Sequence, residues 1–117
     1  RERAELAQAV GFDFIAELLP LVDDLERAID AEAGDDSVRA YREGVELIHK
    51  QLLDLLHRRG VTPIETEGRD FDPNYHQAVS HEVSDGHREG AVIGELRRGY
   101  MLGGRLLRPA MVRVAKA

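Results

Sequence analysis

Apolar residues recur through the first part of the chain with the spacing of an amphipathic helix. Between residues 4 and 32 they alternate at intervals of three and four, and acidic side chains with Arg27 occupy the opposite face. Pro20 and Gly11 oppose the pattern, because a proline inside a helix costs about 3 kcal/mol and interrupts or kinks it. We therefore predict one long, interrupted helix that depends on neighbouring packing. Its apolar stripe consists of Ile15, Leu18, Val22, Leu25 and Ile29.

A second helical pattern follows the polar segment AEAGDDS. Gly34 is a stop signal for the first helix, and Asp36 or Ser37 can cap the next one. The second helix is expected from about 38 to 59, because basic residues fill its last turn and Gly60 ends it. Its stripe is unbroken and consists of Val38, Tyr41, Val45, Ile48, Leu52 and Leu55.

The two predicted helices carry more apolar surface than a single antiparallel pair can cover. Leu47, Leu53 and Leu56 widen the second stripe beyond a narrow seam. A second copy of the chain would close the pair into a four-helix bundle, so we expect a homodimer. The alternative is that the C-terminal segment folds back over the stripes within one chain. The expected dimer residues are Leu18, Val22, Leu25, Ile29, Tyr41, Val45, Ile48, Leu52 and Leu55.

After Gly60 the pattern changes to short β-prone runs separated by glycines. The candidate strands are VTPIE, QAVSHEV, AVIGELRRGYML and RLLRPAMVRVA. Gly103-Gly104 predicts a two-residue hairpin, and Pro109 marks an edge or a bulge. The segment FDPNYHQ reads as a turn. We therefore expect an α+β chain, with helices for dimerisation in residues 1–60 and a small all-β domain in residues 61–117.

Charge is divided unequally along this chain of 117 residues and net charge −6. Residues 96–117 contain six basic side chains and no acidic one, so the preceding residues carry −12. Arginines interleaved with Leu, Met and Val favour a protein-binding surface for an acidic partner. Nucleic acid is the alternative ligand, but the segment lacks stacking aromatics and the acidic remainder would repel phosphate.

Other classes of function find no support in the sequence. The absence of Cys excludes disulfides and thiol chemistry, and the five histidines match no common metal-ligand spacing. Neither a phosphate-binding loop nor a nucleophile elbow is present. No apolar run approaches the roughly 20 residues that span a bilayer. We expect no enzyme, metal, cofactor or membrane association, and because the chain begins without Met we expect a natural N-terminus upstream.

The motifs FDPNYHQAV and GAVIGELRRGYMLGGRLLRPAMVRVAKA resemble the C-terminal signature of the GrpE family, the nucleotide exchange factors of DnaK-type heat-shock chaperones. The segments FIAELLPLVDDLERAI and YREGVELIHKQLLDLLHRRGV are similar to the paired helices of that family. The resemblance spans essentially the whole chain. It implies a dimer with a helical stalk, a four-helix bundle and two β wings, one of which binds the chaperone's ATPase domain, opens its cleft and speeds ADP release.

The resemblance also implies roles for single residues, each on a matching position. Arg105 would contact an acidic patch of the ATPase domain and Leu96 would add an apolar contact, while Gly44 matches a glycine of the bundle. Phe71 and Pro73 either touch the chaperone or brace the wing. The chaperone-facing stretch of the stalk matches Arg27, Asp30 and Ala31.

The implied location is the bacterial cytoplasm, with the mitochondrial matrix as the alternative. Two other functions remain open from the sequence. One is a nucleic-acid-binding coiled-coil dimer that uses the basic C-terminal segment. The other is a structural adaptor that binds a partner without changing nucleotide release.

Overall fold

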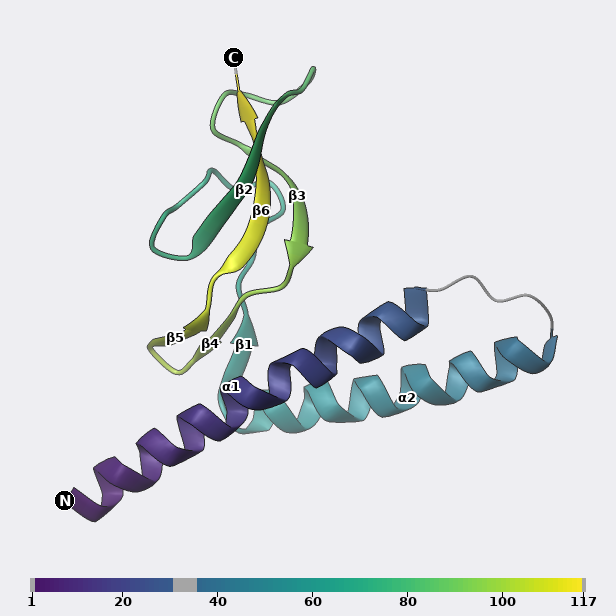
Figure 1. Ribbon diagram of the computed structural model, residues 1–117, viewed down its shortest axis with the longest axis vertical. Coiled ribbons are helices and arrows are strands. Elements are labelled where there is room, and N and C mark those ends of the chain that lie inside the picture. Colours follow the sequence, from purple (N-terminus) through teal and green to yellow (C-terminus); the bar gives the residue numbers. More distant parts are fainter. Residues whose placement is uncertain (1, 31–35, 117) are drawn as a thin grey trace. The chain divides into compact units, whose positions relative to one another are not determined.

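The computed structural model describes residues 2–30 and 36–116, and the chain divides into two compact units between Arg59 and Gly60 (Figure 1). The first unit contains two helices and the second contains six short strands in two sheets. The expected α+β class is therefore confirmed. None of the described helices is both long enough and apolar enough to cross a lipid bilayer.

The helical unit consists of α1, Glu2–Asp30, and α2, Asp36–Arg58, which pack side by side (Figure 1). The helix α1 continues through Pro20, so the predicted interruption there is wrong. Proline removes one intrahelical hydrogen bond and crowds the carbonyl four residues earlier, and this 29-residue helix tolerates that local cost. A hydrogen bond of 3.2 Å joins Glu26 Oε1 of α1 to His49 Nε2 of α2. The predicted stop at Gly34 lies outside the described residues.

One sheet of the β unit is an antiparallel meander. Its strands are β1, Val61–Pro63, β4, Tyr100–Leu102, and β5, Arg105–Arg108, in the order β1-β4-β5. The strands β4 and β5 form the predicted hairpin around Gly103-Gly104, with Leu102 opposite Arg105. Gly103 has φ +58° at the first central position, where a type II′ turn requires a positive value.

The other sheet has its last strand in the middle. It consists of β2, His76–Val83, β3, Val92–Arg97, and β6, Ala110–Lys116, in the order β2-β6-β3 (Figure 1). The strand β6 runs parallel to β2 and antiparallel to β3. Buried side chains of β3 and β6 form a small core, on which Phe71 and Ala78 pack. The buried core residues are Val92, Ala110, Val112 and Val114.

The two longest predicted strands, residues 91–102 and 105–115, are each divided between the two sheets. The divisions lie at Arg98-Gly99 and at Pro109, where the residues belong to no strand. The register is nevertheless shared, because Arg97 stands opposite Met111 in one sheet and Tyr100 opposite Arg108 in the other. The irregularity predicted at Pro109 is therefore present, because proline cannot donate a ladder hydrogen bond. The division at Arg98-Gly99 was not predicted.

Candidate functional site

The two β residues expected to contact a partner lie on edge strands of different sheets. Leu96 lies on β3 and is 60% exposed. Arg105 is the first residue of β5, directly after the hairpin turn, and is also exposed. Edge strands are open to other molecules on one side. Both side chains are therefore presented to solvent, but they do not belong to one strand or one sheet.

The segment before β2 is closed by hydrogen bonds centred on Asp72. Its Oδ1 accepts the N–H of Asn74 at 2.9 Å, and its carbonyl accepts the N–H of His76 at 2.7 Å. The N–H of Asp72 donates to His76 Nδ1 at 2.9 Å. Phe71 packs on the core, and its ring lies 6.0 Å from that of His76. These contacts favour a bracing role for Phe71, whereas Pro73 is exposed.

The helix residues implied by the resemblance lie at the end of α1. Arg27 forms an ion pair of 3.4 Å with Asp24, and the side chains are 80% and 64% exposed. Such an exposed pair contributes little to stability, so Arg27 can change partner at small cost. Asp30 is exposed and is the last residue of α1. Ala31 lies outside the described residues.

The helix α2 presents an apolar row to solvent. Tyr41, Ile48 and Leu55 recur every seven residues and are 80%, 56% and 44% exposed. Gly44 is exposed, and a Cβ atom built on it would meet nothing within 4 Å. By contrast Val22 is completely buried in the single chain. The other expected dimer residues are half-buried; they are Leu18, Leu25, Ile29, Val45 and Leu52.

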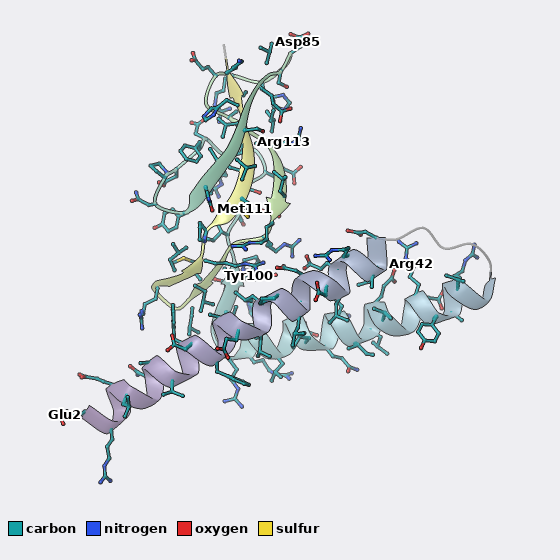
Figure 2. All side chains as sticks on the ribbon, in the orientation of Figure 1. Glu2, Arg42, Asp85, Tyr100, Met111 and Arg113 are labelled. Carbon is teal, nitrogen blue, oxygen red and sulfur yellow. The ribbon has the colours of Figure 1, made fainter. Side chains whose placement is uncertain are left out.

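One basic residue of the C-terminal segment is engaged within its own sheet. Arg113 lies on the central strand β6 (Figure 2). Its register partners are Ser80 and Gly94. Its Nη1 donates to Glu82 Oε1 at 3.2 Å, and Ser80 Oγ donates to Glu82 Oε2 at 2.7 Å. The guanidinium lies over Gly94, where a Cβ atom would stand 2.5 Å from Nη2. This arginine therefore stabilises the sheet.

The same contacts act on the charge of Glu82. The hydrogen bond from Ser80, followed by the positive charge and hydrogen bond of Arg113, lowers the pKa of the Glu82 carboxyl below its ordinary value. Desolvation acts in the opposite direction and is outweighed. The carboxylate is therefore favoured in the folded β unit.

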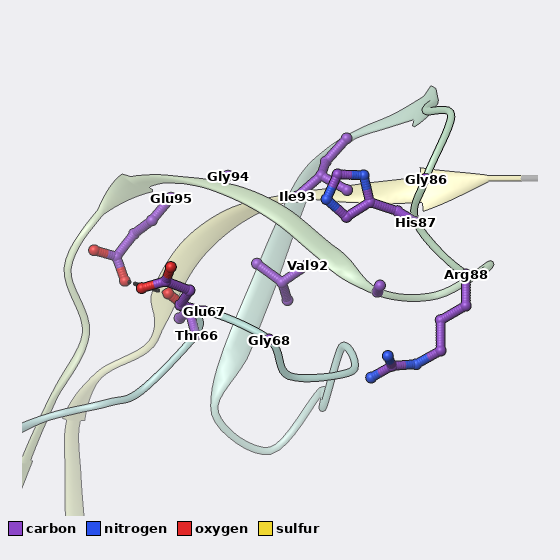
Figure 3. Close-up of a pocket in the computed structure, with 11 residues that line it drawn as sticks. Thr66, Glu67, Gly68, Gly86, His87, Arg88, Val92, Ile93, Gly94 and Glu95 are labelled. Carbon is purple, nitrogen blue, oxygen red and sulfur yellow. Dashed lines mark hydrogen bonds between the residues drawn. The ribbon is translucent and has the colours of Figure 1, made fainter.

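A groove of about 530 Å³ lies between β3 and the loops around residues 66–68 and 86–88 (Figure 3). Thr66 Oγ1 donates to Glu95 Oε2 at 2.9 Å on one side of it, and His87 lines the other. His87 Nδ1 also lies 2.8 Å from Ser84 Oγ. Within residues 2–30 and 36–116 no carboxylate is hydrogen-bonded to His87, so this pair lacks the orienting acid of a catalytic triad.

The described part of the chain contains no cluster of side chains suited to bind a metal ion. No three His, Asp or Glu side chains there come together as a metal site. Exposed arginines and edge strands on the β unit, and an apolar row on the helical unit, are features that can bind macromolecules. A binding surface of this kind works by contact area and charge.

Sequence reasoning missed three interactions that organise the β unit. The hydrogen bond between Asp72 and His76 had a local signal, because an acidic residue before Pro with a histidine four positions later is visible in the sequence. The Arg113–Glu82 contact had no such signal, since it depends on the parallel pairing of β2 and β6. The third is a contact of the Arg108 side chain with the carbonyl of Arg98.

Comparison with known proteins identifies relatives of this chain. The GrpE family model matches residues 1–116. The chain is 46% identical to Protein GrpE of Trichormus variabilis over 116 residues, 98% of this chain and 47% of that protein. It is 46% identical to Protein GrpE of Vibrio vulnificus over 104 residues, 88% and 52% of the two chains. With Protein GrpE of Bacillus subtilis the identity is 38% over 117 residues, 97% and 63%. The chain thus spans about half the length of several curated relatives.

Proposed function

Because this chain belongs to the GrpE family, we propose that it is a co-chaperone that accelerates ADP release from a DnaK-type heat-shock chaperone. The β unit binds the chaperone's ATPase domain and stabilises the open form of its nucleotide cleft. The family match over residues 1–116 carries the proposal. The protein itself changes no covalent bond, so it acts as a binding protein and not as an enzyme.

The energetic requirement on such a protein is differential affinity. A ligand shifts a conformational equilibrium only by the difference between its affinities for the two states. Each tenfold preference for the open cleft contributes about 1.4 kcal/mol. Rigid presentation of a few contact residues is therefore enough, and no catalytic group is needed.

The proposed contacts come from both units. On the β unit, Arg105 meets an acidic patch and Leu96 an apolar one, supported by their exposure on edge strands. On α1, Arg27 and Asp30 face the chaperone, supported by their solvent-exposed positions. Pro73 adds a contact from the turn before β2.

The protein acts as a homodimer in this proposal. The exposed row of Tyr41, Ile48 and Leu55 on α2 has the heptad spacing of a helix–helix seam. Pairing two such rows in a four-helix bundle would remove this apolar surface from water. Gly44, beside the row, would allow close approach of the second copy.

The place of action is the bacterial cytosol, and the mitochondrial matrix is the alternative. The relatives named above come from bacteria. A DnaK-type chaperone as partner requires a compartment that contains one.

The decisive experiment follows release of a fluorescent ADP from a DnaK-type chaperone after addition of catalytic amounts of this protein. Faster release that saturates with concentration supports the proposal, and an unchanged rate across a wide concentration range rejects it. Binding without acceleration identifies the structural adaptor. Retention on heparin or DNA with a steep dependence on salt identifies the nucleic-acid-binding dimer.

A further inference from the structure

The β4–β5 hairpin is joined to the β2-β6-β3 sheet through two adjacent connections. One is Arg98-Gly99, between β3 and β4, and the other is Pro109, between β5 and β6. They lie against each other, because a Cβ atom on Gly99 would stand 2.8 Å from the Pro109 carbonyl carbon and still closer to Ala110 N. Only glycine permits this approach. We call residues 98–99 and 109 the joint of the β unit.

The backbone of residues 109 and 110 donates no hydrogen bond across the joint. The register on both sides places Arg98 opposite Ala110. The Ala110 N–H, however, donates to the carbonyl of Tyr75 at 3.0 Å, and Pro109 has no N–H to offer. Neither Pro109 nor Ala110 therefore offers a backbone N–H to the Arg98 carbonyl.

A side chain donates to the Arg98 carbonyl instead. Arg108 Nε donates to the Arg98 carbonyl at 2.8 Å. The guanidinium of Arg108 also lies 5.4 Å from the ring centroid of Tyr100, its partner across the strands, and Tyr100 is only 1% exposed. A planar cation over a buried aromatic ring is a favourable and directional contact. Arg108 thus bridges the joint from both sides.

We propose that Arg108 is a positioning residue that fixes the direction of the β4–β5 hairpin, and with it Arg105, relative to the β2-β6-β3 sheet. The inference rests on the proposed function, in which Arg105 contacts the chaperone. Without the Arg108 side chain, both chain connections at the joint remain, but the hydrogen bond to the Arg98 carbonyl is lost. In our proposal this bond sets the angle between the hairpin and the β2-β6-β3 sheet. The hairpin then samples several directions, and binding must select one of them, which lowers the apparent affinity.

The first test measures the hairpin directly. Residual dipolar couplings of backbone N–H groups in the 117-residue chain report the orientation of β4 and β5 against β2 and β6. Arg108→Met is expected to change the hairpin couplings and to leave those of β2 and β6 mutually consistent. Arg97→Met is the matched control, because Arg97 is an exposed arginine on the neighbouring β3, and it is expected to leave the hairpin orientation unchanged.

The second test measures ADP release. Arg108→Met is expected to raise the half-saturating concentration about tenfold, or 1.4 kcal/mol, with the maximal rate unchanged. The double variant with Arg105→Ala is expected to lose little more affinity than Arg105→Ala alone. Both substitutions act through the same contact, that of Arg105 with the chaperone. If Arg108→Met does not fold, Arg108→Lys replaces it, since lysine keeps the charge near Tyr100 without the planar Nε donor.

The inference would be overturned if Arg108→Met kept both the dipolar couplings and the half-saturating concentration of the unsubstituted protein. Fully additive losses would also overturn it, because they would make Arg108 an independent contact. Failure of the unsubstituted chain to accelerate release would instead reject the proposed function, so the two failures are distinguishable.

Discussion

At the scale of single residues, the β unit is organised by contacts that cross from one segment to another. The Glu82 carboxylate receives hydrogen bonds from Ser80 and from Arg113. Gly99 permits the close approach of two connections, and the hydrogen bond of Asp72 to His76 closes the turn before β2. Each of these contacts depends on one specific group, so each can be tested by one substitution.

The lowered pKa of Glu82 predicts acid sensitivity of the β unit. The unfolded chain binds a proton on this carboxyl more readily than the folded one, so the stabilisation is present above the unfolded pKa and is lost as pH falls through the folded pKa. We expect the free energy of unfolding to decrease over that acidic range, and Glu82→Gln to remove this part of the decrease. Chemical denaturation at a series of pH values checks it, and the exposed Glu67→Gln serves as control.

Gly99→Ala is expected to destabilise the β unit by about 2 kcal/mol or more, because the new methyl group meets backbone atoms that have no room to move. Gly11→Ala should have the opposite sign and stabilise α1 by about 0.5–1 kcal/mol, since nothing lies within 4 Å of a Cβ atom there. Thermal unfolding of both variants measures the difference. An unchanged melting temperature for Gly99→Ala would mean that the joint is looser than described.

The Nδ1 atom of His76 accepts the N–H of Asp72, so the neutral ring must carry its proton on Nε2. We expect long-range ¹H–¹⁵N spectra of the imidazole to show the Nε2–H tautomer. Observation of the Nδ1–H tautomer at neutral pH would contradict the hydrogen bond that closes the turn.

At the scale of elements, the row of exposed apolar residues on α2 is the feature with the clearest consequence. A charge placed in the row would have to be buried in the proposed bundle without a partner. Ile48→Glu is therefore expected to shift the protein from dimer to monomer at micromolar concentration in sedimentation experiments. Lys50→Glu places a negative charge at an exposed position on the opposite face of α2 and should leave the dimer intact. If both variants dimerised equally well, the row of Tyr41, Ile48 and Leu55 would not be part of the dimer interface.

The helices and the hairpin could be predicted from the sequence, whereas the pairing of distant strands could not. Both helices follow from apolar spacing, because a helix is defined by neighbours three and four residues apart. The hairpin at Gly103-Gly104 is equally local. Residues 91–102 and 105–115 are each divided at the joint because their two halves pair with strands of different sheets. The parallel pairing of β2 with β6 joins segments that are far apart in the sequence. Local patterns carry no information on such partners.

The candidate site divides in the same way. Arg105, Leu96 and Arg27 could be named from motifs, and their roles remain predictions. The roles of Arg108 and Arg113 could not be named, because both follow from neighbours across a strand. Both are arginines of one basic segment, yet Arg113 bonds to Glu82 while Arg108 bonds to a backbone carbonyl. Composition cannot distinguish arginines that bind a partner from arginines that hold the fold.

At the scale of the whole molecule, the net charge resides in the helical unit. Residues 1–59 contain eight basic and 14 acidic side chains, whereas residues 60–117 contain eight of each. The basic segment of residues 96–117 is thus balanced by acidic residues of the same unit. This distribution favours recognition by individual exposed arginines over a general attraction to polyanions.

Arg105→Glu is expected to weaken chaperone binding and slow ADP release, because it replaces an attractive charge with a repulsive one at the proposed contact. Circular dichroism and dimerisation should remain unchanged, since Arg105 is exposed. Lys116→Glu changes the net charge of the same unit equally and is the control. Normal exchange by Arg105→Glu would remove Arg105 from the binding surface.

The position of β6 in its sheet has a consequence for synthesis of the protein. Because β6 separates β2 from β3, neither of these strands has its hydrogen-bonding partner until residues 110–116 have left the ribosome. The nascent chain therefore exposes two unpaired strands until residues 110–116 are translated, although the helices can form well before. Translation that stops short of residue 110 would yield helical chains without a folded β unit, and their unpaired strands would be prone to aggregate.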